Sequence, residues 1–138
     1  MGKGIREVMT SKVCSIDAEK PVAYAAKMMR DEDVGLAPIV EGDRLVGTLT
    51  DRDIAIRVVA EGRDPESTKV RDVASTDLVT VDPQQDLDEA LRLMAQHQVR
   101  RIPVIEEDGR LVGVVAQADV AREADDRQTG EVVEQISR

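Results

Sequence analysis

The chain carries one sequence pattern twice, and this duplication constrains its fold more than any other feature. Residues 44–55 and residues 110–121 are identical at six of twelve positions. An internal duplication implies two copies of one supersecondary unit that pack together, and a ligand cleft often forms where such copies meet. Upstream of these segments the two copies also match, at a spacing one residue shorter. The matching pairs are Val8 and Val73, Asp17 and Asp82, Ala25 and Ala90, Met29 and Met94, Val34 and Val99, and Pro38 and Pro103.

The composition limits the classes of function. A length of 138 residues suits one compact domain, or two small halves that share a core. Tyr24 is the only aromatic residue, and the formal net charge is -9. A chain without aromatic stacking platforms and with an acidic balance is a poor partner for nucleic acid. No apolar run is long enough for a signal peptide or a membrane helix, so we expect a cytoplasmic protein that does not engage a membrane.

Each copy shows the same order of secondary-structure signals. A short β-forming run, at 13–16 and again at 78–81, precedes a helical pattern of apolar residues. Two β-forming runs around a polar turn come next, and then a second helix. In the first copy that second helix is expected to carry Ile54, Ala55, Val58 and Val59 on one face.

The order β-α-β-β-α in each copy predicts an α/β (α+β) fold. One such unit has too little sheet to bury both faces, so we expect the two copies to pack with their sheets in contact. The predicted domains are repeat 1 at 5–60, a linker at 61–69, repeat 2 at 70–125 and a C-terminal tail at 126–138.

The segment from Gly47 to Asp53 carries the sharpest motif. It takes a buried strand directly into a helix N-terminus, with the Thr50 hydroxyl and the Asp53 carboxylate three residues apart. Backbone N–H groups and the helix dipole favour an anion there, so Thr50 could bind a phosphate oxygen and Asp53 the diol of a ribose. The same spacing also fits a capping box, which would stabilise the helix by roughly 1 kcal/mol and bind nothing. Both interpretations remain open on the sequence.

The second copy differs at this motif. Asp119 matches Asp53, but Ala116 stands where the first copy has Thr50. A carboxylate present without its capping partner indicates another use for that carboxylate, or a favourable contact with the helix dipole.

The chain resembles a CBS domain pair. It has two β-α-β-β-α copies, and each copy has a glycine six residues before an aspartate and a proline between apolar strand residues. Such a pair is also called a Bateman module. Residues 5–125 of this chain resemble its stand-alone bacterial form. The resemblance implies a pseudo-twofold pair with an adenosine-containing ligand in a cleft between the copies. The ligands in question are AMP, ADP, ATP, NAD-type molecules and S-adenosylmethionine. In the family's pattern the motif hydroxyl contacts phosphate and the motif aspartate contacts ribose, which assigns these roles to Thr50 and Asp53.

The resemblance also implies the remaining ligand contacts. The base is expected against backbone and apolar side chains of the first strand and of the strand that contains the proline. The phosphates are expected near basic residues of the other copy. The residues implied are Cys14, Ser15, Ile16, Ala37, Pro38 and Ile39 for the base, with Arg100 and Arg101 for the phosphates. A solvated basic turn is the alternative interpretation of the two arginines.

A second site would be weak. It is expected to face Gly35, Leu36 and Ala37, where the first copy supplies no cation, and Ala116 supplies no hydroxyl. Charge-assisted hydrogen bonds contribute roughly 1.5–3 kcal/mol each, so we expect one competent nucleotide site and one weak or empty site. The residues implied for the weak site are Asp119, Val79, Thr80 and Pro103.

The remaining candidate residues give weaker indications of function. Cys14, the only cysteine, is expected to be a small buried apolar side chain rather than a reactive thiol. His97, the only histidine, has no second histidine or cysteine with which to bind a metal, and is expected to face solvent or a satisfied partner. No catalytic triad and no phosphate-binding Gly-Lys-Thr loop is present, so we expect neither a metal site nor catalysis.

These observations favour a non-catalytic regulatory module. It is expected to form a homodimer, to hold no tightly bound cofactor, and to bind an adenine nucleotide or related adenosine ligand reversibly. It would signal energy or redox state to an effector protein of unknown identity. The main alternative is a constitutive structural or adaptor dimer with vestigial clefts, and an enzyme that acts on nucleotides is a third possibility.

Overall fold

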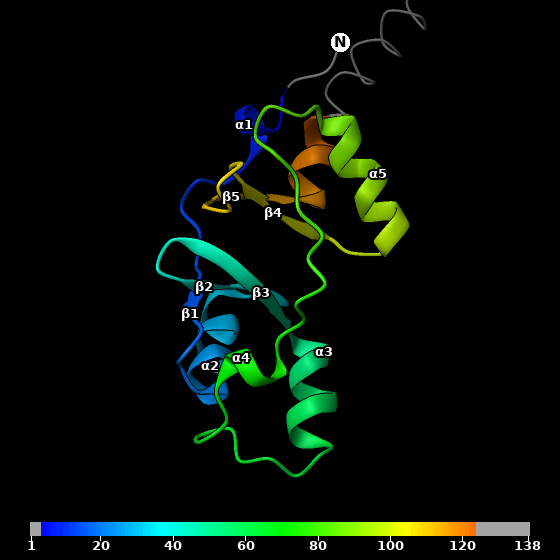
Figure 1. Ribbon diagram of the computed structural model, residues 1–138. Coiled ribbons are helices and arrows are strands. Elements are labelled where there is room, and N and C mark those ends of the chain that lie inside the picture. The colour runs from blue at the N-terminus through cyan, green and yellow to red at the C-terminus, as the bar shows by residue number, and fades with distance from the viewer. Residues whose placement is uncertain (1–3, 124–138) are drawn as a thin grey trace, which may run out of the picture. The chain divides into compact units, whose positions relative to one another are not determined.

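The computed structural model describes residues 4–123, and its helices and strands are labelled in Figure 1. These residues divide between two compact units. The first unit contains residues 12–78 and 105–112, and the second contains residues 79–104 together with 4–11 and 113–123. The predicted tail at 126–138 lies outside the described residues.

A three-stranded sheet forms the centre of the first unit. Its strands are β1 (Ile16–Asp17), β2 (Leu36–Glu41) and β3 (Arg44–Thr50), in the order β1-β2-β3. β1 is parallel to β2, whereas β2 and β3 form an antiparallel hairpin. Gly42 lies in the tight turn of this hairpin with φ 64°, a conformation that glycine adopts at no steric cost. The predicted hairpin is confirmed.

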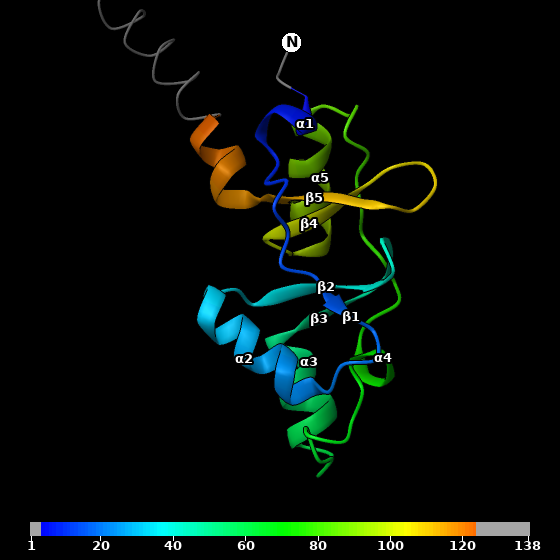
Figure 2. The same ribbon diagram turned by 90° about the vertical axis from the view of Figure 1, so that its left-hand side faces the viewer.

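Two helical segments cover one face of this sheet (Figure 2). They are α2 (Val22–Glu32) and α3 (Asp51–Ile54), and α3 continues as the π-helical turn η1 (Ala55–Val59). Aliphatic side chains from the sheet and the helices fill the space between them, and full burial of each large one contributes about 1.5–3 kcal/mol. The core residues are Ile16, Ala18, Val22, Ala25, Met29, Ala37, Ile39, Leu49, Val58, Val70, Val73 and Ala74.

The second unit repeats this plan. It contains α1 (Ile5–Val8), α5 (Leu87–His97), β4 (Arg101–Ile105) and β5 (Leu111–Ala116), and residues 117–123 are helical. β4 and β5 form a two-stranded sheet. Residues 105–112, which form the turn between β4 and β5 and the strand ends next to it, belong to the first unit. There the backbone N–H of Leu111 donates to the carbonyl of Asp43, and that of Leu45 donates to Gly109.

The first predicted strand of each copy is much shorter than expected. β1 has two residues instead of the four at 13–16, and the run at 78–81 is reduced to a single parallel bridge between Val81 and Val104. The next pairing position in the parallel register is Pro38 in the first copy and Pro103 in the second. Proline has no amide hydrogen, so each ladder loses a donor at this point.

The predicted apolar face of the second helix is wrong in two positions. Val58 is buried and Ile54 is half-buried, but Ala55 and Val59 are exposed. The cause is the π-helical turn, in which the Ala60 N–H donates to the Ala55 carbonyl five residues back. A wider turn changes which side chains share a face.

The short helix that precedes each repeat completes the unit built mainly from the other repeat. α1 belongs to the second unit, where the Ile5 N–H donates to the Gln85 carbonyl at 2.8 Å. α4 (Val70–Val73) belongs to the first unit, where the Val70 N–H donates to the Lys20 carbonyl at 2.9 Å. The sequence places these segments next to their own repeats, so the exchange is a tertiary property that local pattern does not predict.

The motif glycines make room for these exchanged segments. In the first unit Ser75 and Thr48 exchange two backbone hydrogen bonds, and a Cβ on Gly47 would lie 3.1 Å from the Ser75 carbonyl oxygen. In the second unit Thr10 and Val114 pair in the same way, and a Cβ on Gly113 would lie 2.6 Å from Met9 Sδ. The duplicated glycine therefore has a packing role in both units.

Among residues 4–123 no helix has the length and apolar character required to cross a membrane.

Candidate functional site

The corner between β3 and α3 holds Thr50 and Asp53 in one rigid arrangement. Thr50 is the N-cap of α3, and its Oγ1 accepts a hydrogen bond from the Asp53 N–H at 3.0 Å. In return the Thr50 N–H donates to Asp53 Oδ2, also at 3.0 Å. The capping-box interpretation of this motif is therefore confirmed.

The capping box leaves groups that could still bind a ligand. Within the described chain no hydrogen bond uses the Thr50 hydroxyl as a donor, so its proton remains free for an acceptor such as a phosphate oxygen. The Asp53 side chain is 15% exposed, and a carboxylate has about four acceptor positions, of which Thr50 takes one. The box thus orients both groups without using all of their hydrogen-bonding capacity.

Arg57 is a contact of this corner that the sequence reasoning missed. Its Nε lies 3.8 Å from Asp53 Oδ1, and its Nη1 donates to the Val73 carbonyl at 3.2 Å. The signal was present in the sequence, because an acid and a base four residues apart on a helix are neighbours. The corner is therefore connected to the C-terminal end of α4.

The corresponding corner of the second unit has the same backbone and different side chains. The Gln117 N–H donates to the Arg100 carbonyl at 2.6 Å, just as the Asp51 N–H donates to the Gly35 carbonyl at 3.0 Å in the first unit. Ala116 offers no hydroxyl. Asp119, the match of Asp53, forms an ion pair with Arg122, and its side chain is 26% exposed.

The residues implied for the base divide between surface and core. Cys14 and Ser15 are exposed, whereas Pro38 is buried. Ile16, Ala37 and Ile39 are at most 1% exposed and belong to the hydrophobic core, so only their backbone could reach a ligand.

Cys14 departs from its expected environment. The expectation of a buried apolar side chain is wrong, because the free thiol lies on the surface. Val13 to Ser15 precede the short strand β1 and do not pair with β2, so this part of the chain is not drawn into the sheet. Partial desolvation and the nearby Glu32 carboxylate raise the pKa of the thiol, which disfavours a reactive thiolate.

The two arginines line a hollow in the second unit. Arg100 is exposed and Arg101 is half-buried, and the hollow has a volume of about 450 Å³. Within residues 4–123 neither guanidinium forms an ion pair with a carboxylate. The other lining residues are Ala116, Gln117, Ala118 and Ala121.

The residues expected for the weak second site also lie in the second unit. Val79 and Thr80 are half-buried and Pro103 is buried. The Pro103 carbonyl accepts a hydrogen bond from the Val81 N–H at 3.1 Å. Asp119 is the only ionisable member of this group.

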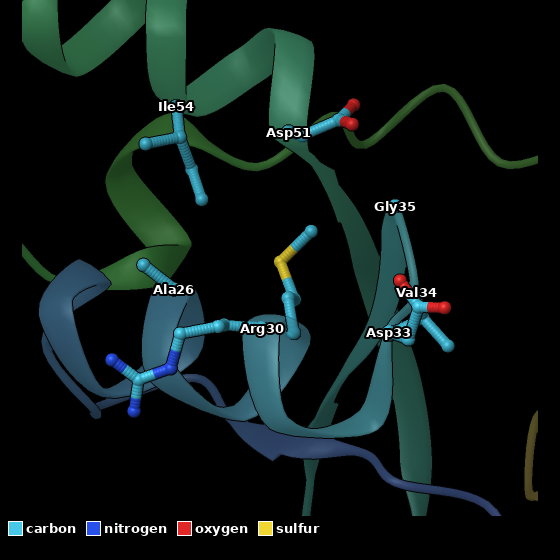
Figure 3. Close-up of a pocket in the computed structure, with 8 residues that line it drawn as sticks. Ala26, Arg30, Asp33, Val34, Gly35, Asp51 and Ile54 are labelled. Atoms are coloured by element: carbon cyan, nitrogen blue, oxygen red, sulfur yellow. The ribbon is translucent and has the colours of Figure 1, made fainter.

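A second hollow, of about 460 Å³, lies in the first unit between α2 and the start of α3 (Figure 3). Its polar groups include Asp51, whose carboxylate would lie 3.2 Å from a Cβ on Gly35. Gly35 and Asp51 occupy the positions that Arg100 and Gln117 occupy in the second repeat, so equivalent corners carry opposite charge. The lining residues are Ala26, Met29, Arg30, Asp33, Val34, Gly35, Asp51 and Ile54.

Two further expectations concern His97 and metals. His97 is exposed at the end of α5, as expected. Within the part of the chain that the structure describes, no three His, Cys, Asp or Glu side chains are grouped so that they could hold a metal ion.

The family follows from the two repeats. The model of the CBS domain matches residues 5–60 and 70–126, which is most of the chain. The chain therefore belongs to the CBS domain family, and its fold is that of a CBS domain pair.

Known members show how close this relation is. The CBS domain-containing protein YhcV of Bacillus subtilis (strain 168) is 44% identical over 117 residues, which are 85% of this chain and 82% of that protein. The crystal structure of Hypoxic Response Protein I with two coordinated zinc ions has a TM-score of 0.80 and 41% identity, over 87% of this chain and 98% of that chain. The CBS domain pair of protein MJ0100, in complex with 5'-methylthioadenosine and S-adenosylmethionine, has a TM-score of 0.77 over 88% of this chain and 95% of that one. At 20% identity this last likeness concerns the fold alone.

Proposed function

We propose that this protein is a non-catalytic regulatory module that binds an adenosine-containing ligand at the corner of Thr50 and Asp53. The observation that carries the proposal is the geometry of that corner. A free hydroxyl proton and a mostly buried carboxylate are held side by side, ready for a phosphate oxygen and a ribose diol. The second repeat keeps the carboxylate in Asp119 but lacks the hydroxyl.

We also propose that Arg100 and Arg101 are an anion-binding pair, at the hollow that they line in the second unit. The chain is acidic, and both guanidinium groups are nevertheless left without a carboxylate partner in the described residues. An arginine that binds phosphate contributes a charge-assisted hydrogen bond of roughly 1.5–3 kcal/mol. The repeat 1 positions that match them, Gly35 and Leu36, carry no charge, which supports one strong site rather than two.

The class of ligand is chosen for its chemistry. An adenosine ligand supplies a vicinal diol for Asp53 and, in its phosphorylated forms, an anion for Thr50. The related fold of MJ0100 holds such ligands, and we extend that chemistry to this chain as part of the proposal. Binding would bias the conformation that an effector protein in the cytoplasm reads, because a ligand shifts an equilibrium only through differential affinity.

We further propose that the module is a homodimer. Two large apolar side chains on η1 face solvent in the single chain, Ile56 at 45% and Val59 at 71% exposure. Contiguous exposed apolar surface marks interaction sites, and these two residues are three positions apart on one helical segment.

A constitutive adaptor is the second candidate, and one observation favours it. The capping box gives both Thr50 and Asp53 a structural role at the start of α3, so the motif needs no ligand to account for its presence. Under this candidate the same dimer would form, and no adenosine compound would stabilise it.

Thermal melts distinguish the two candidates. The protein is melted with AMP, ADP, ATP, NADH and S-adenosylmethionine, each at millimolar concentration. A ligand at about 100 times its dissociation constant stabilises the folded state by about 2.7 kcal/mol, which raises the melting temperature by several degrees. We expect Asp53→Ala to abolish the shift and Asp119→Ala to leave most of it. The absence of a shift with all five compounds would favour the adaptor.

A further inference from the structure

Arg57 makes two contacts that join the proposed nucleotide corner to a distant part of the chain. Its Nε faces Asp53 Oδ1 at 3.8 Å along the helix, and its Nη1 donates to the Val73 carbonyl at 3.2 Å. The Arg57 side chain is half exposed, and Asp53 is mostly buried. One guanidinium therefore forms an ion pair with a mostly buried carboxylate and a hydrogen bond with a backbone carbonyl sixteen residues away.

The Val73 carbonyl stands at the start of the connector, which we define as residues 73–78. Val73 is the last residue of α4, and the connector leads to Val79, the first residue of this stretch that belongs to the second unit. Within the connector, Ser75 exchanges two backbone hydrogen bonds with Thr48, at 2.8 and 2.9 Å. Thr48 lies on β3, two residues before Thr50, so the connector passes beside the strand that forms the corner.

We propose that Arg57 is a positioning residue that couples the Asp53 carboxylate to the connector, so that occupancy of the corner stabilises the pairing of Ser75 with Thr48. The ligand-dependent part of this proposal rests on the proposed function. The coupling between Asp53 and the connector is a property of the chain itself and can be measured without a ligand.

The direction of the effect follows from the carboxylate geometry. Asp53 Oδ2 already accepts a hydrogen bond from the Thr50 N–H, and the side chain is mostly buried, so the carboxylate has little freedom to rotate. A carboxylate with spare acceptor positions can take two hydroxyl groups without releasing Arg57. A bound diol therefore restricts Asp53 further, keeps Arg57 in place and strengthens its hold on Val73.

The second repeat lacks this device. The position that matches Arg57 is Glu123, which has the opposite charge, and Asp119 is paired with Arg122 instead. Coupling of this kind is thus confined to the corner that has the hydroxyl.

The ligand-free test is amide hydrogen exchange at Thr48 and Ser75 in four proteins: wild type, Arg57→Gln, Asp53→Asn and the double variant. Asn keeps an oxygen that can accept from Thr50, so the cap survives while the charge is lost. We expect each single variant to speed exchange at Ser75 about 5- to 10-fold, and the double variant to add little to either. Additive effects, or no change in Asp53→Asn, would overturn the coupling.

Two variants control for local damage. Arg52→Gln removes a guanidinium from the same helix. Among the described residues Arg52 forms no side-chain hydrogen bond or ion pair with Asp53 or Val73, so exchange at Ser75 should not change. Arg57→Lys retains the charge next to Asp53 but cannot reach both partners with one rigid fork, so it should rescue only part of the protection. Full rescue by lysine would contradict the need for the carbonyl contact.

The ligand arm uses ATP and S-adenosylmethionine as probes. We expect a compound that binds wild-type protein to slow exchange at Ser75 about 5-fold or more, and to lose at least 5-fold in affinity in Arg57→Gln. Unchanged affinity in Arg57→Gln would refute the ligand coupling. If neither probe binds wild-type protein, the proposed function fails for these ligands, while the ligand-free comparison still decides whether Arg57 couples Asp53 to the connector.

Discussion

Thr50 and Asp53 show that a capping box can fix two side chains and still leave hydrogen-bonding capacity on both. The Thr50 oxygen accepts from the backbone while its proton stays free, and Asp53 uses one acceptor position on the cap and faces Arg57 with its other oxygen. The sequence reasoning presented the cap and the ligand site as alternatives. The geometry makes the two interpretations compatible, because the cap leaves the hydroxyl proton and further acceptor positions of the carboxylate unused. Asp119, which has no capping threonine, is held by Arg122 instead.

At this scale we predict that the Thr50 cap stabilises the fold even without a ligand. Thr50→Ala removes the acceptor for the Asp53 N–H and should lower the free energy of unfolding by about 1 kcal/mol. Thr50→Ser keeps the hydroxyl and should lose only a fraction of this. Urea denaturation followed by circular dichroism measures the free energy of unfolding of both variants. Equal stability of Thr50→Ala and wild type would show that the cap does not stabilise the fold.

At the scale of elements, the duplicated pattern was sufficient to predict the hairpins and the long helices α2 and α5. It could not predict the length of the first strands, because the parallel register that places Pro38 and Pro103 opposite them is a tertiary feature. The outward turn of Val59 was missed because a π-helical turn has no simple apolar signature. The exchange of α1 and α4 between units was missed because the lead-in sequences resemble each other, and local pattern does not say which copy each one joins.

The exchanged segments yield a prediction for the motif glycines. Gly47→Val places a branched side chain against the Ser75 carbonyl and Ala74 Cβ, where even a single Cβ would lie at 3.1 and 3.3 Å. We expect a loss of about 1–3 kcal/mol in the free energy of unfolding, as for other overpacked sites. Gly4→Ala is a matched control, because its Cβ would meet nothing closer than 3.9 Å and its φ of -76° suits any residue. Equal unfolding midpoints for the two variants would contradict the packing role of Gly47.

At the scale of the whole molecule, the two repeats keep one backbone plan and differ in charge and hydroxyl content at equivalent corners. The first has Gly35, Thr50 and Asp51, whereas the second has Arg100, Ala116 and Gln117. The sequence alone showed this asymmetry, because it depends on residue identity at matched positions. The contacts that connect each corner to its own unit, such as Arg57 with Val73, required coordinates.

The proposed homodimer is also tested at this scale. Val59→Lys places a charge on the exposed apolar surface of η1 and should shift the protein from dimer to monomer in sedimentation velocity. Glu66→Lys introduces the same residue at an exposed turn and should leave the dimer intact. A Val59→Lys protein that still sediments as a dimer would place the interface elsewhere.

Isothermal titration calorimetry tests the asymmetry of the two corners most directly. The protein is titrated with whichever of the five adenosine compounds gives the largest thermal shift, in wild type, Asp53→Asn and Asp119→Asn. We predict one ligand per chain in wild type and no measurable binding in Asp53→Asn. In Asp119→Asn we predict a dissociation constant within about threefold of wild type. A change this small corresponds to well under about 1.4 kcal/mol of binding energy, the amount that weakens affinity tenfold. Two equivalent ligands per chain, or equal loss of binding in both variants, would contradict the account.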